Sequence, residues 1–102
     1  MLFRSLKREQ PFVLGMDASE IREEWPKGET VYVQGIIDAC FREGEGIVLL
    51  DYKTDRVSDA ATLVSRYRIQ LDLYARALER ISGISVTQKL IWSFALHKEI
   101  EV

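Results

Sequence analysis

The feature that most constrains the fold is a stretch of helical periodicity between residues 64 and 81. Its apolar positions, separated by three or four residues, are Val64, Tyr67, Leu71, Tyr74, Leu78 and Ile81. This spacing places them on one face of an α-helix. Ser58 or Asp59 can cap the helix at its N-terminus, and Gly83 is a typical C-terminal stop. We therefore predict one long helix that ends before Gly83.

Apolar runs on both sides of this helix predict strands. Residues 47–53 begin with the continuous run IVLL, which is typical of a central strand covered on both faces. Residues 85–96, SVTQKLIWSFAL, form a second run of similar apolar character. The helix therefore connects two strands.

The segments upstream predict two further strands and a hairpin. Residues 10–16 and 30–41 are rich in β-branched and aromatic side chains, and EGEG at 43–46 predicts a tight turn. Residues 97–102 are interpreted as a charged tail. The predicted order is β-β-β-α-β. A hairpin-linked run followed by a helix that crosses to another strand indicates a mixed sheet of the α/β (α+β) class, not a doubly wound one.

Size, cysteine content and charge restrict the class of protein. The 102 residues, 47% of them hydrophobic, suit a single small globular domain, residues 1–102. A lone cysteine, Cys40, excludes an internal disulfide and a four-cysteine zinc or iron–sulfur site. We expect a cytoplasmic domain without membrane association, because no apolar run of 18 residues or signal-peptide core occurs. The net charge of −2 is uninformative, since site acids and surrounding basic residues cancel in the sum.

Two acids and a lysine are predicted to meet at the hairpin. A turn at 43–46 places Asp38 roughly opposite Asp51 on the neighbouring strand. Lys53 follows Asp51 by two residues, so the strand period directs both side chains to one face, and Tyr52 to the other. Two facing carboxylates repel each other unless a cation lies between them.

Oxygen ligands favour a hard divalent ion, Mg²⁺ or Mn²⁺, over zinc at such a place. The backbone carbonyl of Tyr52 is a further candidate ligand. Lys53 beside the ion can orient or deprotonate a water, or stabilise charge on a phosphate. For DYK alone, a solvated ion pair is the simpler interpretation. Asp38 favours the metal site, because an unpartnered acid inside an apolar strand is costly.

Gln70 and Tyr74 form a third predicted part of the site. They lie four residues apart on the helix, so the amide and the phenol project together. Beside the acids they can hold a phosphate or a nucleobase. Taken alone, Tyr74 is equally interpreted as a core residue.

Three motifs in this order, GIIDACF, LLDYKTDRV and YRIQLDLYARAL, resemble the RecB-type nuclease domain of the PD-(D/E)XK superfamily. The resemblance is greatest to the C-terminal nuclease domain of bacterial AddA helicase-nuclease subunits and covers the chain from about residue 6. It implies a restriction-endonuclease-like core. The implied function is a Mg²⁺-dependent DNA nuclease (exonuclease) domain of an ATP-dependent helicase-nuclease in double-strand-break repair and recombination.

The resemblance also implies roles for residues. It assigns Asp38 and Asp51 as metal ligands, Lys53 as the catalytic lysine, and Gln70 with Tyr74 as a DNA-contacting Q-x-x-x-Y element. Glu9 resembles an acid on an early strand that adds to the metal site, although an exposed edge charge is an equal alternative. The helix arginines, Arg66 in particular, are candidate DNA contacts or a solvated face. A catalytically inactive module for DNA binding or subunit docking is therefore the alternative function.

The sequence departs from the family pattern in two respects. Family members carry a helix before the first strand, often with a histidine of the metal site. No such segment precedes Leu2, and His97 follows the last predicted strand. We therefore expect a part excised from a longer protein, inactive in isolation if the missing helix is required.

The implied partners are DNA, the helicase domains of the parent chain and an AddB-type subunit. No Walker A motif occurs, so no ATP site is expected in this chain. The single cysteine argues against an AddB-type chain, with its iron–sulfur cluster, and against the small CRISPR-associated nucleases.

Overall fold

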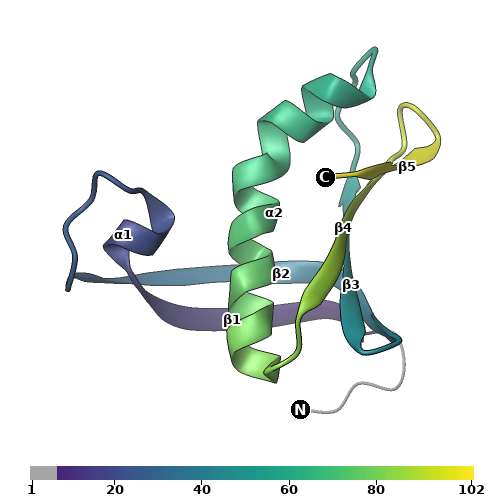
Figure 1. Ribbon diagram of the computed structural model, residues 1–102. Coiled ribbons are helices and arrows are strands. Elements are labelled where there is room, and N and C mark those ends of the chain that lie inside the picture. The colour runs from purple at the N-terminus through teal and green to yellow at the C-terminus, as the bar shows by residue number, and fades with distance from the viewer. Residues whose placement is uncertain (1–6) are drawn as a thin grey trace.

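The strands of the sheet lie side by side in chain order (Figure 1). The computed structural model describes residues 7–102. The strands are β1 (Lys7–Asp17), β2 (Thr30–Glu43), β3 (Gly46–Lys53), β4 (Val86–Ser93) and β5 (Lys98–Glu101). Strands β3 and β4 pair in parallel, whereas the other neighbours are antiparallel. The predicted mixed sheet is therefore confirmed, and its central strand is β3.

Strands β2 and β3 form the predicted hairpin. The ladder closes at Glu43 and Gly46, leaving a two-residue loop whose first residue is Gly44. Gly44 has φ +61°, a left-handed conformation that a residue with a side chain rarely adopts. The loop length fixes the register of the hairpin, so it also decides which residues of the two strands face each other.

Helix α2 (Ala60–Ser82) connects β3 to its parallel neighbour β4 and packs along one face of the sheet (Figure 1). Of the two candidate caps, Asp59 is used: its carboxylate accepts a hydrogen bond of 2.9 Å from the Thr62 N–H. The helix ends at Gly83, which has φ +74°. The buried helix residues are Leu63, Leu71, Ala75, Ala77 and Leu78. No helix in residues 7–102 has the length and apolar character needed to cross a membrane.

Two short elements differ from the predicted order. The charged tail is strand β5, which pairs with β4 and buries Ile100. An edge strand needs only one buried side chain, so its charged neighbours hid the pattern. Helix α1 (Ala18–Ile21) was not predicted either, because four residues are too few for a periodic signal. It lies at the outer end of the long β1–β2 ribbon (Figure 1).

Candidate functional site

The hairpin strands separate at the two predicted acids. The β2–β3 ladder runs up to Ala39 and Leu50, and the next step of the same register would pair Asp38 with Asp51. Here the Tyr52 backbone N–H donates a hydrogen bond of 2.9 Å to Asp38 Oδ2. A side chain thus takes the place of a ladder bond, which opens the sheet beside both carboxylates.

Asp51 is buried, with 4% of its surface exposed. It ends the β3 face that carries Ile47 and Leu49, which lie in the core against α2. Burial, reinforced by the neighbouring Asp38 carboxylate, raises the pKa of Asp51 to about 6, although the Lys53 ammonium acts in the opposite direction. Lys53 Nζ lies 3.0 Å from Asp51 Oδ2 but outside hydrogen-bond geometry, so this buried oxygen has no donor.

Lys53 is held between the sheet and helix α2. Its Nζ lies 4.0 Å from the centroid of the Tyr67 ring, in cation–π geometry. Burial lowers the pKa of Lys53, but its pairing with the Asp51 carboxylate outweighs burial, so the net shift is upward. The amine therefore stays charged at neutral pH.

Tyr67 was predicted only as part of the apolar helix face. Its hydroxyl donates a hydrogen bond of 2.7 Å to Asp55 Oδ2, which also accepts one of 2.6 Å from Arg66. Asp55 therefore orients the ring that lies against Lys53. The periodicity gave Tyr67 the correct face, but only the fold brings it to Lys53, so sequence analysis assigned it no functional role.

Glu9 lies near Asp38, at an irregular place in β1. The pairs Arg8–Ala39 and Gln10–Ile37 flank it, so the register sets Glu9 opposite Asp38 without a ladder pair between them. Its φ is +48°, which is rare for a residue with a side chain. Arg8, Glu9, Asp38 and Tyr52 line a hollow of about 380 Å³.

The acids do not form a closed metal cage. Within residues 7–102, no group of three or more Asp, Glu, His or Cys is arranged to hold a metal ion. The two carboxylates nevertheless fit a divalent cation, because Asp51 Oδ2 is buried without a donor beside a second carboxylate. The Tyr52 carbonyl points to the same edge of β3 as its N–H, towards Asp38.

Tyr74 packs over β2 at a glycine. A Cβ atom at Gly35 would lie 2.5 Å from the Tyr74 hydroxyl oxygen, so only glycine permits this approach. The Tyr74 ring also meets Phe12 edge to face, with centroids 5.1 Å apart. Gln70, one turn earlier, is half-buried. Tyr74 thus has a packing role, three residues along β2 from Asp38.

The helix arginines are mostly engaged within the chain. Arg66 pairs with Asp55, Arg76 donates to the Glu20 carbonyl, and Arg80 pairs with the Glu20 carboxylate. The last two contacts attach α1 to α2. Arg68 is exposed and makes no hydrogen bond or ion pair within residues 7–102. The alternative of a helix face free to bind a DNA backbone is therefore weakened.

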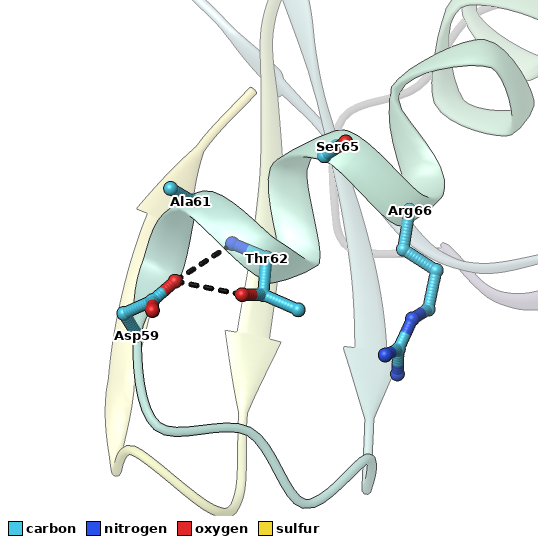
Figure 2. Close-up of a pocket in the computed structure, with 5 residues that line it drawn as sticks. All are labelled: Asp59, Ala61, Thr62, Ser65 and Arg66. Atoms are coloured by element: carbon cyan, nitrogen blue, oxygen red, sulfur yellow. Dashed lines mark hydrogen bonds between the residues drawn. The ribbon is translucent and has the colours of Figure 1, made fainter.

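The largest hollow lies elsewhere, at the N-terminus of α2 (Figure 2). It measures about 600 Å³, and its lining residues are Asp59, Ala61, Thr62, Ser65 and Arg66. The Asp59 carboxylate accepts hydrogen bonds from both the N–H and the hydroxyl of Thr62, as the dashed lines show. The chain's own anion thus caps this helix end, so the hollow is poorly suited to a phosphate. The carboxylates around Asp38 remain the better candidate.

Comparison with known proteins agrees with this geometry. The family model of the PD-(D/E)XK nuclease superfamily matches residues 3–101. An ATP-dependent helicase/nuclease subunit of Clostridium novyi (strain NT) is 39% identical over 104 residues, covering 96% of this chain and 8% of that protein. The corresponding subunit of Exiguobacterium sibiricum is 40% identical over 111 residues, covering 100% of the chain and 9% of the relative. The chain spans less than a tenth of the length of these relatives.

Proposed function

The chain belongs to the PD-(D/E)XK nuclease superfamily, and from this premise we propose that it is the DNA-cleaving domain of an ATP-dependent helicase-nuclease. The observation that carries the proposal is the buried Asp51 carboxylate, aligned with Asp38 and lying 3.0 Å from Lys53. The reaction is hydrolysis of phosphodiester bonds, in an exonuclease that acts in double-strand-break repair and recombination. Its substrate would be chromosomal DNA in the bacterial cytoplasm.

Asp38 and Asp51 would hold the cation, Mg²⁺ or Mn²⁺, with the Tyr52 carbonyl as a third oxygen. A bound divalent ion lowers the pKa of a coordinated water and neutralises charge on the phosphate. Glu9 lies at the rim of the same hollow and is a candidate for an outer ligand. The raised pKa of metal-free Asp51 supports this arrangement, because a cation would relieve the repulsion between the acids.

Lys53 would carry the catalytic positive charge. Its ammonium is fixed between Asp51 and the Tyr67 ring, where it can stabilise a phosphate under attack or orient the attacking water. An upward pKa shift favours the charged form, so electrostatic stabilisation is the better supported of these two roles. Proton abstraction by Lys53 would require the neutral amine.

DNA would lie along the opening between α2 and the hairpin. Gln70 and Tyr74 are the proposed DNA contacts on the helix, and Arg66 could join them only by giving up Asp55. The relatives' length supports further partners: the helicase domains of the same polypeptide and a second, AddB-type subunit. These domains would use ATP and feed the strand to the site.

Three variants test the assignment. In calorimetric titrations of the 102-residue chain with Mn²⁺, Asp38→Ala and Asp51→Ala should abolish the binding heat, whereas Lys53→Met should retain it. In the full-length helicase-nuclease, all three should abolish DNA cleavage and spare unwinding. Cleavage at the parental rate by Asp51→Ala would refute the assignment. Loss of cleavage without any Mn²⁺ binding by the parent sequence would instead favour an inactive binding module.

A further inference from the structure

Three aromatic side chains form a cluster on the sheet face opposite α2. Tyr52 of β3 and Trp92 of β4 are register neighbours, and Phe94 follows β4 directly. The Phe94 ring centroid lies 6.3 Å from that of Tyr52 and 6.4 Å from that of Trp92. We refer to Tyr52, Trp92 and Phe94 as the aromatic cluster.

The cluster is open to solvent. Tyr52 is 40% exposed and Phe94 is 49% exposed, although both lie beside the buried residue Asp51. Single exposed apolar residues are ordinary on protein surfaces, but three aromatic rings in mutual contact form a patch that typically binds something. The rings are also held in place, because the Phe94 N–H donates a hydrogen bond of 3.1 Å to the Lys53 carbonyl.

The position of the cluster indicates what it binds. Tyr52 is the residue between Asp51 and Lys53, and it lines the same hollow as Glu9 and Asp38. Arg8, exposed at this hollow, adds a positive charge at its rim. A strand with one phosphate at the two acids therefore has its adjacent nucleotides beside these rings.

We propose that the aromatic cluster is a stacking platform for one or two unpaired bases of single-stranded DNA, next to the carboxylates of Asp38 and Asp51. The proposal rests on the proposed nuclease function and specifies its substrate class. Aromatic faces bind bases of any sequence, because every base has a flat π-face. In a duplex these faces are stacked and covered, so the platform selects single strands.

A matched surface elsewhere provides the control. Tyr32 is 76% exposed on the β1–β2 ribbon, in the company of the aliphatic residues Val13 and Ile36. Gly15 faces it across the ladder. Tyr32→Ala therefore removes an exposed ring that has no acid pair beside it.

The test uses Trp92 fluorescence in the 102-residue chain. Trp25→Phe leaves Trp92 as the single tryptophan. Titration with an oligothymidylate in Ca²⁺ should quench its emission to saturation. An abasic strand of equal length, or a duplex, should bind at least tenfold more weakly, since stacking on aromatic residues contributes about this factor per base.

Variants identify the rings responsible. Tyr52→Ala and Phe94→Leu, each in the Trp25→Phe background, should weaken oligothymidylate binding about tenfold, while Tyr32→Ala should leave it unchanged. Phe94→Leu keeps an apolar side chain, so it preserves folding. Unchanged affinity in Phe94→Leu, or equal binding of the abasic strand, would overturn the platform and point to a protein-docking surface.

The two proposals fail in different ways. If the chain binds Mn²⁺ through Asp38 and Asp51 but shows no base-dependent quenching, the platform is wrong and the metal site stands. If quenching is base-dependent but no Mn²⁺ binds, the platform stands as a DNA-binding surface and the nuclease assignment is wrong.

Discussion

The ammonium of Lys53 lies 4.0 Å from the centroid of the Tyr67 ring, which joins the end of strand β3 to helix α2. The Tyr67 hydroxyl is in turn fixed by Asp55, 2.7 Å away. Lys53 is the residue proposed to stabilise the reacting phosphate, so a ring that limits its motion preorganises the site. Tyr67 is thus a positioning residue for Lys53.

We expect Tyr67→Leu to lower the single-turnover rate of DNA cleavage by the full-length helicase-nuclease. A cation–π contact of about 0.5–2 kcal/mol corresponds to a loss of roughly twofold to thirtyfold. Tyr67→Phe keeps the ring and loses only the bond to Asp55, so it should retain most of the rate. Equal losses in the Leu and Phe variants would show that the hydroxyl, not the ring, positions Lys53.

The pKa of Asp51 makes folding stability depend on pH in metal-free solution. This pKa rises from 3.8 to about 6, chiefly through burial, so the native state favours the protonated acid. The stabilisation is complete below pH 3.8 and is lost as the pH rises through 6. At 1.36 kcal/mol per pKa unit, ionised Asp51 costs the metal-free fold up to about 3 kcal/mol.

Asp51→Asn should therefore stabilise the metal-free chain at pH 7–8 by about 1–3 kcal/mol, the lower value allowing for the partner that Lys53 loses. Below pH 4 the variant and the parent should unfold at the same urea concentration. Urea unfolding in EDTA between pH 3.5 and 8 measures the difference. A gain that does not grow with pH would show that the pKa of Asp51 is not raised.

Several parts of the fold follow from local sequence. The length of the hairpin loop after Glu43 sets the register that aligns Asp38 with Asp51, and helical periodicity identifies α2 up to Gly83. Such features depend on neighbouring residues, so they can be predicted from the sequence. A strand period of two is likewise enough to separate Tyr52 from the face of Asp51.

Other features depend on contacts between distant segments. Strand β5 buries only Ile100, which leaves no alternating pattern in the sequence. The left-handed backbone of Glu9 and the contact of Lys53 with Tyr67 arise only when the elements pack. The same holds for the aromatic ring of Phe94, which lies in a turn and was predicted to continue a strand.

The approach of Tyr74 to β2 predicts a specific sensitivity at Gly35. Gly35→Ala would place Cβ 2.5 Å from the Tyr74 hydroxyl oxygen, so the ring must move, at a cost of about 1–3 kcal/mol of unfolding free energy. Gly15→Ala, on the same ribbon, meets Thr30 at 3.3 Å and should cost clearly less. Urea unfolding of both variants tests this. Similar costs would show that the sheet, not the Tyr74 contact, requires glycine.

Divalent cations should reverse the penalty at Asp51. A cation between Asp38 and Asp51 binds the native state only, so Mn²⁺ at a hundred times its dissociation constant should add about 2.7 kcal/mol to the unfolding free energy. Asp51→Asn should unfold at the same temperature with and without Mn²⁺, so the variant that stabilises the metal-free chain loses the response to metal. Tyr32→Ala should respond as the parent does. Differential scanning calorimetry at pH 7.5 makes the comparison, and equal stabilisation of Asp51→Asn would place the ion elsewhere.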